Sequence, residues 1–325
     1  MTNSDASVVV IVLNFRTPEI TIDCLRTLAA EAAGLPGLRV VLIDNASGDD
    51  SVPKIRAAID ENAWVGWLDF RPLPTNLGFS GGNNVVVREI LAEAEPPRFL
   101  LFLNSDTLVH AGCLARCMHI LATDPTIGAL SCMLLNRDGS VQNVCRRFPR
   151  PDREVVRALG LPWLFPKFFS WADLEDPGWD RKAGPRDVDW VGGAFLMMPI
   201  AVVRKSGSLS EQFFFYGEDC ELCFRVHRAG YRVRFDPSAS IVHLGGASSD
   251  GVRLRNRTKE IYRWQARLLI QRKCYGPVAE WTVRGAYILA FGLRMILLTL
   301  RGRRKTDAFV DAQEGFSQLT GPLRP

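Results

Sequence analysis

LLFLNSDT, residues 100–107, is the stretch that decides the fold, because an apolar run ends abruptly in polar side chains. Four large apolar residues in succession predict a strand that is buried on both faces, which is typical of a parallel sheet. An amide, a hydroxyl and a carboxylate follow directly. In open parallel sheets, ligands bind beyond the C-terminal ends of the strands. We therefore expect a binding site at Asn104, Ser105 and Asp106.

The chain before this strand alternates between apolar runs and helical patterns. Strands are predicted over residues 8–14, 39–44, 64–70 and 99–104, and helices from residue 18 and over 51–59 and 82–94. This alternation predicts an α/β fold with a mostly parallel central sheet and helices on both faces. Two further strands end in polar residues, at Asn14 and at Asp44. Because parallel strands end at one edge of the sheet, we expect these ends beside Asn104.

The pattern after residue 125 is less regular. Strands are predicted over 128–135, 188–198, 231–235 and 240–244, with a helix after Gly217 and basic helices from residue 253. The segment 146–185 is rich in proline and aromatic residues, and loops of that length are usually functional. It is either a binding loop or a packed cover. We expect a first domain over 1–250, divided near residue 125 into two halves, and a helical region over 251–325.

Composition limits the class of protein. Apolar residues make up 47% of the 325 positions, which is enough for a sizeable core and argues against disorder. Residues 251–305 contain fourteen Lys or Arg against two Glu, a local charge of +12, whereas the whole chain carries +5. A basic end fits a membrane surface or simply a solvated helix. The first fifteen residues lack the basic and cleavage regions of a signal peptide. The eight cysteines are therefore expected to be reduced, and no zinc-site spacing is present.

Three groups of residues are candidates for chemistry, and each has an ordinary alternative. Asp106 suits a hard divalent cation, or it caps a turn. The glycine-rich stretch 76–84 precedes a helix and suits an anion or a flat ring, or it is a plain turn. It lacks both the P-loop and the dinucleotide-binding patterns. Glu218 and Asp219 suit a general base, or they stabilise a helix N-terminus. A histidine in an apolar strand, as at His243, is more often a core residue than a ligand.

Eight motifs occur together in one order between about residue 7 and residue 245. They read VVVIVLNF, VLIDNASGDDS, NLGFSGGNN, LFLNSDT, DGSVQNVCRRFP, WVGGAFLMM, FFFYGEDCELCFRVHRAGYRV and IVHLGG. With these motifs the chain resembles the inverting family 2 glycosyltransferases of GT-A fold, and within them the rhamnosyltransferase-like subgroup. One motif alone would carry little weight, whereas eight in register are specific.

The resemblance implies a role for each matching residue. The catalytic base would be Asp219, with Glu218 beside it, and a divalent cation, Mg²⁺ or Mn²⁺, would be held by Asp106 and His243. Asn104 stands where the family's Asp-x-Asp motif has its first acidic residue, which leaves the cation fewer charged ligands. The nucleotide sugar would be bound by Asn14, Asp44, Asn76, Gly78, Asn83, Asn104 and Ser105. The acceptor and sugar pocket would be shaped by Trp190, Gly192 and Gly193. The domain over 1–250 would be the GT-A catalytic domain, with the nucleotide-sugar half over about 1–125 and the acceptor half over about 126–250, and the segment 146–185 would be an acceptor-side loop.

The resemblance also implies a reaction and its partners. It favours the transfer of L-rhamnose from dTDP-rhamnose, with inversion, to a hydroxyl of a glycan or polyprenyl-linked glycan acceptor, as in cell-wall polysaccharide synthesis. We expect no nucleic-acid partner. Two other classes are alternatives: a nucleotidyltransferase that makes a sugar nucleotide, and a non-catalytic sugar-nucleotide-binding protein. The first would normally have a basic, glycine-rich signature after its first strand, and the second would lack a base.

Residues 285–300 form an apolar stretch with one charge, Arg294, and basic flanks. A spanning helix needs about 20 apolar residues, and a central arginine costs about 2.5–3.5 kcal/mol on insertion scales. We therefore expect an interfacial helix on an anionic membrane surface, in a cytoplasmic protein peripheral to the inner face of the membrane. The alternative is packing on the catalytic domain or on a second copy in a homo-oligomer.

Overall fold

The structure is a computed structural model that describes residues 7–175, 184–245, 256–304 and 306–321. It divides into two compact units. The first contains Met1–Arg146, Gly178–Phe214 and Glu218–Leu254, and the second contains Arg147–Pro177, Phe215–Gly217 and Arg255–Pro325. The predicted boundary at residue 250 lies outside the described residues. The aromatic segment that follows Arg147 belongs to the second unit, although the sequence placed it in the acceptor half.

The first unit is built on a nine-stranded sheet in the order β3-β2-β1-β4-β8-β6-β9-β5, with β7 paired to β9. Strands β3, β2, β1 and β4 are parallel, whereas β8 is antiparallel to both of its neighbours. This arrangement confirms the predicted α/β class. The strands are β1 (Val8–Asn14), β2 (Leu38–Asp44), β3 (Leu68–Pro72), β4 (Phe99–Asn104), β5 (Thr107–Val109), β6 (Ile127–Leu135), β7 (Arg186–Val188), β8 (Phe195–Pro199) and β9 (Arg232–His243).

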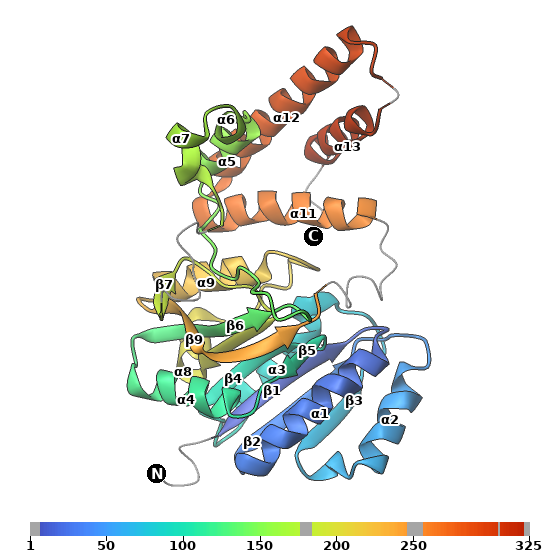
Figure 1. Cartoon of the computed structure of the whole chain (residues 1–325), viewed down its shortest axis with the longest axis vertical. Helices are drawn as coiled ribbons and strands as arrows, with labels where there is room; N and C mark the ends of the chain where they lie inside the picture. The colour runs from blue at the N-terminus through green and yellow to red at the C-terminus, as the bar shows by residue number, and fades with distance from the viewer. Residues whose placement is uncertain (1–6, 176–183, 246–255, 305, 322–325) are drawn as a thin grey trace. The chain divides into compact units, whose positions relative to one another are not determined.

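Helices cover both faces of this sheet because the chain changes direction across it. The chain moves outward from β1 to β3 and then returns to β4 on the other side of β1. Right-handed crossovers place α1 and α2 on one face and α3 on the other, and Figure 1 shows α1 and α2 side by side. The helices of this unit are α1 (Pro18–Gly34), α2 (Ser51–Glu61), α3 (Gly78–Ala92), α4 (Cys113–Thr123), α8 (Ile200–Ser206) and α9 (Glu218–Arg228).

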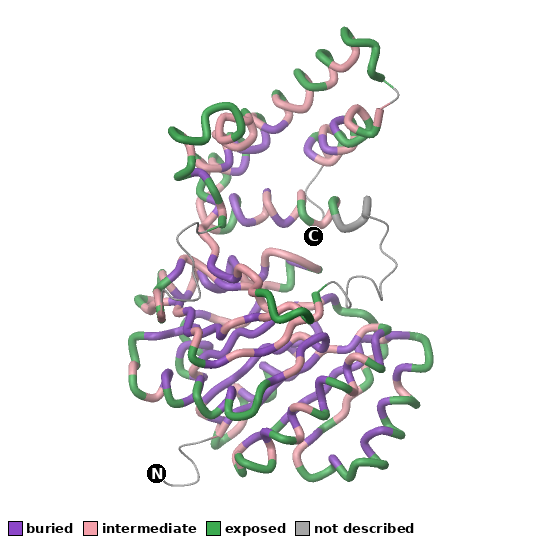
Figure 2. The backbone as a smooth tube through the Cα atoms, viewed as in Figure 1, coloured by how far each residue is buried: buried purple, intermediate pink, exposed green. Residues whose placement is uncertain are grey.

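Burial explains why the central strands read as unbroken apolar runs. Every residue from Val8 to Val12 and from Phe99 to Leu103 is buried, as the tube in Figure 2 shows for the middle of the sheet. A strand with a helix on each side has no solvent face, so it lacks the alternation of a half-exposed strand. The predicted bounds of β1 and β4 are confirmed for the same reason.

Three predicted elements differ from the structure. The strand expected over 64–70 is a short 3-10 turn, η2 (Trp64–Gly66), followed by β3, because buried Trp64 packs on Trp67. The strand expected over 188–198 is split into β7 and β8 at a stretch that contains Gly192 and Gly193. The helix expected over 82–94 begins at Gly78. In each place a local turn or glycine conformation overrides the apolar pattern.

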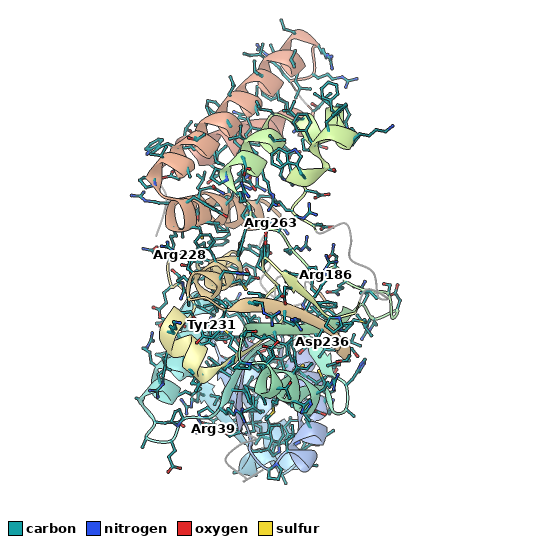
Figure 3. All side chains as sticks on the ribbon, turned by 90° about the vertical axis from the view of Figure 1, so that its left-hand side faces the viewer. Arg39, Arg186, Arg228, Tyr231, Asp236 and Arg263 are labelled. Atoms are coloured by element: carbon teal, nitrogen blue, oxygen red, sulfur yellow. The ribbon has the colours of Figure 1, made fainter. Side chains whose placement is uncertain are left out.

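The two strands expected over 231–235 and 240–244 are one strand, β9, with an irregularity. Cys132 of β6 pairs with Asp236, and the next residue, Met133, pairs with Ser240. Asp236, labelled in Figure 3, accepts a hydrogen bond from the backbone N–H of Ser238 at 2.9 Å, which stabilises the bulge. The polar residues that suggested a break therefore form a bulge within a continuous strand.

The second unit is helical. Its elements are α5 (Pro151–Ala158), α6 (Leu161–Leu164), α7 (Pro166–Phe169), η3 (Ser170–Ala172), α11 (Asn256–Ile270), η5 (Gln271–Tyr275), α12 (Pro277–Leu300) and α13 (Asp307–Thr320). Leu268, Val283, Tyr287 and Leu319 form its buried core. Buried Glu154 of α5 accepts a hydrogen bond from the Tyr287 hydroxyl at 2.8 Å, so α5 is tied to α12. Much of the segment expected to be a loop over 146–185 is thus helical.

Candidate active site

Three polar strand ends lie side by side at one edge of the sheet, as the sequence predicts. Asn14 at the end of β1 is in register with Asp44 at the end of β2. On the other side of β1, Leu13 is in register with Asn104 at the end of β4. The order of the parallel strands therefore assembles these ends from residues 30 to 90 positions apart in the chain.

Asn14 and Asp44 are joined in a buried polar group that we call the β1–β2 shelf: Asn14, Asp44, Asn45, Ser47 and Asn76. Asn14 Nδ2 donates to Asp44 Oδ1 at 2.7 Å. Asp44 also accepts from the Ser47 hydroxyl at 2.5 Å and from its backbone N–H at 3.0 Å. Asp44 is only 1% exposed. Its contacts hold the loop after β2, and its direct contact with a nucleoside stays a prediction.

The shelf continues to the glycine-rich stretch through Asn45. Asn45 Nδ2 donates to Asn76 Oδ1 at 3.0 Å and to the Gly78 carbonyl at 3.1 Å. Its Oδ1 accepts from the Leu77 N–H at 3.0 Å. The sequence predicts Asn45, with Asp44, at this polar strand end, but it predicts no role for Ser47, which lies in the same motif VLIDNASGDDS. The signal that could have found Ser47 is its place in the loop that follows a buried strand.

Packing accounts for two of the glycines in this stretch. A Cβ atom on Gly78, whose φ is +70°, would lie 2.7 Å from the Phe214 carbonyl oxygen. A Cβ atom on Gly82 would lie 2.4 Å from Leu13 Cδ1. Asn83 is buried and donates to the Phe79 carbonyl at 2.8 Å within α3. These positions bring α3 close to β1, so a ligand role for Gly78 and Asn83 remains a prediction.

Backbone strain marks the same strand ends. Arg16 and Ala46, which are not glycines, have φ values of 59° and 56°. The Arg16 N–H donates to Ser47 Oγ at 2.9 Å, so the loops after β1 and β2 brace each other. Non-glycine residues in the left-handed region cost about 1–3 kcal/mol and are concentrated at functional sites. The observation favours this edge of the sheet as the site.

Asp106 and His243 approach each other across the pair β5–β9. Thr107 is in register with His243, and the Leu244 N–H donates to the Asp106 carbonyl at 2.9 Å. His243 Nε2 lies 3.4 Å from Asp106 Oδ1. Asp106 is 2% exposed, and neither its Oδ1 nor Ser105 Oγ has a hydrogen-bond partner within the described part of the chain. The structure thus brings together the two residues predicted to hold a metal.

This pair fits a divalent cation that is shared with a ligand. A buried carboxylate oxygen without a partner is costly unless a cation or donor satisfies it. Among the described residues no group of three or more His, Cys, Asp or Glu side chains forms a metal cluster. Mg²⁺ and Mn²⁺ are commonly bound through one or two protein ligands, with water and substrate phosphates in the other positions. Asp106 and His243 match that pattern.

The carboxylates of Glu218 and Asp219 begin helix α9. Glu218 is buried, and its Oε2 has no hydrogen-bond partner among the residues described. Desolvation, with the charge of Asp219 as a second cause, raises the pKa of Glu218 to about 8. Desolvation also raises the pKa of Asp219, whereas hydrogen bonds from the N–H groups of Cys220 and Gly193 oppose the rise. Burial of the two adjacent carboxyl groups therefore favours retention of a proton at Glu218, next to the hydrogen-bonded carboxylate of Asp219.

Asp219 faces the two glycines before β8. Its Oδ2 accepts from the Gly193 N–H at 2.9 Å, and its Oδ1 from the Cys220 N–H at 2.7 Å. Each oxygen keeps a second lone pair. A Cβ atom on Gly192 would lie 3.9 Å from Asp219 Oδ2. Trp190, at the start of the same stretch, bonds through its backbone to Arg146.

One backbone contact links the two halves of the site. The Asn104 N–H donates to the carbonyl of Ala194 at 3.1 Å. Asn104 directly precedes Ser105 and Asp106, and Ala194 directly follows Gly193, which contacts Asp219. The Gly193 N–H that holds Asp219 and the loop that contains Asp106 are thus connected through the paired ends of β8 and β4. Such an arrangement can place an anionic leaving group near Asp106 and a hydroxyl near Asp219.

Comparison with known proteins identifies the family. Residues 5–266 match the family described as Glycosyltransferase like family 2, a match that includes every site residue discussed above. The chain belongs to this family. It is a glycosyltransferase, so the predicted family and enzyme class are confirmed.

Curated relatives of this glycosyltransferase are distant. It is 24% identical over 294 residues to the N-acetylglucosaminyl-diphospho-decaprenol L-rhamnosyltransferase of Mycobacterium tuberculosis, covering 84% of this chain and 89% of that protein. It is 26% identical over 227 residues to the low-salt glycan biosynthesis hexosyltransferase Agl10 of Haloferax volcanii, covering 69% of this chain and 62% of that protein. The rhamnosyltransferase WbbL of Escherichia coli is 24% identical over 192 residues, covering 58% and 66%. The chain thus spans less than two thirds of Agl10 and WbbL.

Solved structures share the fold of this glycosyltransferase. The mannosyltransferase PcManGT from Pyrobaculum calidifontis, solved in complex with GDP-Man and Mn²⁺, aligns with a TM-score of 0.52 at 17% identity, covering 96% of this chain and 84% of that one. TarS 1–349 of S. aureus aligns with a TM-score of 0.52 at 14% identity, covering 96% and 91%. At these identities the likeness establishes the GT-A fold alone.

Proposed function

We propose that this enzyme transfers L-rhamnose from dTDP-rhamnose, with inversion, to a hydroxyl of a lipid-linked glycan. The observation that carries the reaction type is the Glu218–Asp219 pair, in which the Asp219 carboxylate is held by two backbone N–H groups beside the buried carboxyl of Glu218, whose pKa is raised. The choice of sugar is supported by two relatives that are named rhamnosyltransferases. One of them is named for a diphospho-decaprenol acceptor, which supports a lipid-linked substrate.

The reaction is a single displacement. Asp219 accepts the proton of the acceptor hydroxyl as that oxygen forms a bond to the anomeric carbon. The bond between that carbon and the diphosphate oxygen breaks on the opposite face, and the nucleoside diphosphate leaves with the electron pair. Because attack and departure are on opposite faces, the anomeric configuration inverts. The N–H groups of Gly193 and Cys220 hold the carboxylate of Asp219 in a fixed orientation.

Asp106 and His243 would hold a divalent cation beside the diphosphate. When bound, such a cation offsets the negative charge that develops on the leaving group. The buried Oδ1 of Asp106 supports this role, because it has no hydrogen-bond partner in the part of the chain that is described. Ser105 Oγ, which also lacks a partner there, would donate to a phosphate or sugar oxygen of the donor.

A binding and turnover screen tests the proposal. The purified protein is offered a panel of nucleotide sugars, including dTDP-rhamnose, UDP-glucose and GDP-mannose, with and without Mg²⁺ or Mn²⁺. We expect cation-dependent binding of dTDP-rhamnose above the others and inverted product on a polyprenyl diphosphate acceptor. Preference for another nucleotide would overturn the donor assignment. Formation of a sugar nucleotide from a sugar phosphate would instead support the nucleotidyltransferase alternative.

We also propose that the second unit contacts a membrane surface. The helix expected from residue 285 begins at Pro277 and is, in the described chain, the one helix long and apolar enough to cross a membrane. Its first turns are packed in the unit through buried Glu280, Val283, Arg284 and Tyr287, which argues against spanning. Its second half exposes one apolar face, formed by Leu289, Leu293, Ile296, Leu297 and Leu300.

Two further features of the same unit support this proposal. The segment that contains α6 and α7 exposes Trp163 and Phe168 at 85% and 78%, together with Leu164 and Phe165. Exposed Arg301, Arg303 and Arg304 follow α12, and each cation near an anionic surface contributes about 1 kcal/mol. Exposed aromatic and basic side chains in one unit are both typical of proteins that bind a membrane interface. A lipid-linked acceptor would require this location.

Liposome co-sedimentation tests the membrane proposal. We expect the full chain to bind anionic liposomes at low salt, and the double variant Leu293→Asn, Leu297→Asn to bind at least tenfold less. Val65→Asn, which alters an exposed apolar residue of the first unit, is the matched control and should bind like the wild type. Equal recovery of all proteins in the supernatant, with a dimer seen in sedimentation analysis, would favour an oligomer interface instead.

A further inference from the structure

The motif DGSVQ, residues 138–142, received no role in the reaction, yet it lies beside the proposed metal site. It follows β6 and forms a tight turn in which the Gly139 N–H donates to the Asn136 carbonyl at 2.9 Å. Leu135 bridges Val141 across this turn, and the Gln142 N–H donates to the Leu134 carbonyl at 2.9 Å. The turn therefore holds Gln142 by its backbone.

Gln142 contacts His243 twice through its side-chain amide. Its Nε2 donates to the backbone carbonyl of His243 at 2.7 Å. Its Oε1 lies 2.8 Å from His243 Nδ1. A carbonyl oxygen can only accept, so the nitrogen of the amide must face it. The oxygen of the amide must then face Nδ1, and Nδ1 must carry the proton.

The orientation of the Gln142 amide is also determined by a chain of hydrogen bonds that ends at Asp138. The carboxylate of Asp138 accepts from the Ser140 hydroxyl at 2.6 Å, and those hydrogen bonds lower the pKa of Asp138. The Ser140 oxygen accepts from Asn136 Nδ2 at 2.8 Å. Asn136 Oδ1 accepts from Gln142 Nε2 at 2.7 Å. Each member donates toward Asp138, so every amide in the chain has one allowed orientation.

We infer that this chain, which we call the Asp138–Gln142 relay, holds His243 as the tautomer with the proton on Nδ1. The ring nitrogen that remains, Nε2, then has a free lone pair. It lies 3.4 Å from Asp106 Oδ1, which is itself an acceptor without a hydrogen-bond partner among the described residues. In the neutral tautomer these two acceptors repel each other, unless a proton or a metal cation lies between them. Gln142 is thus a positioning residue that makes His243 a metal ligand.

The inference rests on the proposed metal site but is tested apart from it. The chain has four histidines, so ¹⁵N-histidine labelling gives four sets of imidazole signals. Long-range ¹H–¹⁵N spectra at about pH 9, above the ordinary histidine range, report the tautomer of each ring without metal or donor. We expect His243 to show a single tautomer, with Nδ1 protonated. A protonated Nε2, or a mixture, in the wild type would overturn the inference.

Two variants of Gln142 separate positioning from packing. Gln142→Glu keeps an acceptor for Nδ1–H and should retain the tautomer. Gln142→Met keeps the size but removes the acceptor, and it should give a mixture of tautomers. A packing role predicts the same tautomer in both, which would contradict the inference. Ser240→Ala, which removes the 2.8 Å partner of His110 Nδ1, is the matched control and should leave His243 unchanged.

Titration with Mn²⁺ provides the second readout. Bound Mn²⁺ broadens nearby imidazole signals, and we expect those of His243 to broaden first in the wild type. Gln142→Met should weaken the affinity for Mn²⁺ about 10–100-fold, the usual effect of removing a partner of a metal ligand. An unchanged affinity would overturn the positioning role. If Mn²⁺ did not broaden the His243 signals of the wild type, ligation by His243 would be wrong. The donor screen tests rhamnosyl transfer independently of this result.

Discussion

The β1–β2 shelf and the metal–base side of the site differ in how their buried polar atoms are satisfied. In the shelf, the Asn14 amide donates to the Asp44 carboxylate, which also accepts from the Ser47 N–H, and the Asn45 amide donates to the Gly78 carbonyl. On the other side, Ser105 Oγ, Asp106 Oδ1 and Glu218 Oε2 are buried without a hydrogen-bond partner in the described chain. Both regions lie at the ends of neighbouring strands and have similar residue types. The difference is that the polar side chains of the shelf hydrogen-bond within the chain, whereas the three atoms of the other region do not.

This difference distinguishes a region that supports the structure from a region that can bind a ligand. A buried polar atom without a partner costs about 1–3 kcal/mol, and a bound ligand that supplies the partner would remove that cost. The shelf fixes the loops that border the site, and the metal–base side provides the atoms that react or bind. Substitutions should therefore affect folding in the first region and function in the second.

Asp219→Asn should give the largest effect. The amide cannot accept a proton, so we expect turnover to fall about 10²–10⁴-fold while donor binding stays near normal. The measurement is initial rate and donor affinity on protein shown to be folded. Glu218→Gln is the matched control, because a protonated carboxyl and an amide are similar at neutral pH. Wild-type turnover in Asp219→Asn with an inactive Glu218→Gln would reverse the two roles.

The stability of the wild type relative to Glu218→Gln should depend on pH. The pKa of Glu218 is raised to about 8 in the folded state, so the folded protein binds a proton that the unfolded chain releases near its ordinary range. The stabilising effect of that proton is complete below the unfolded pKa and is lost as pH rises toward 8. At about 1.4 kcal/mol per unit, the loss amounts to a few kcal/mol. Urea unfolding at several pH values measures it, and a constant difference between the proteins would contradict the assignment.

Asp106→Ala should remove cation-dependent donor binding. We expect at least a 10–100-fold loss of affinity for the nucleotide sugar in the presence of Mn²⁺, because the charged ligand is gone. Without cation, the variant and the wild type should bind the donor equally weakly. Calorimetry with and without Mn²⁺ provides the measurement. Retention of the full cation dependence would remove Asp106 from the metal site.

A matched pair of substitutions sharpens the comparison most directly. In the wild type the Asp44 carboxylate accepts hydrogen bonds from Asn14 and Ser47. Asp44→Asn places an N–H₂ group against one of these donors, so it should lower the free energy of unfolding by about 1–3 kcal/mol. Asp106→Asn breaks no hydrogen bond at Oδ1 and should change it by less than about 0.5 kcal/mol or raise it. Denaturant curves of the two variants decide the matter. If Asp106→Asn were the more destabilised, the distinction between scaffold and site would be wrong.

The sequence by itself determined the fold class and brought the right strand ends together. Unbroken apolar runs such as Val8–Val12 identify strands covered on both faces, and the right-handed crossover then leaves few topologies. Motif order identified the family. These inferences succeeded because they depend on local periodicity and on rules that apply to any parallel sheet.

Only the tertiary structure decided which polar residues are scaffold and which are free to react. Asp44 and Asp106 both lie at the ends of buried strands. Asp44 accepts hydrogen bonds from Asn14 and Ser47, whereas Asp106 Oδ1 has no hydrogen-bond partner among the described residues and lies 3.4 Å from His243 Nε2. The roles of Asn45 and Gln142 likewise depend on partners 31 and 101 positions away in the chain. Whether a buried oxygen has a partner is set by which distant segments the fold brings against it. The spacing of residues along the chain does not predict which distant segments meet. The division between scaffold and site therefore appears only in the tertiary structure.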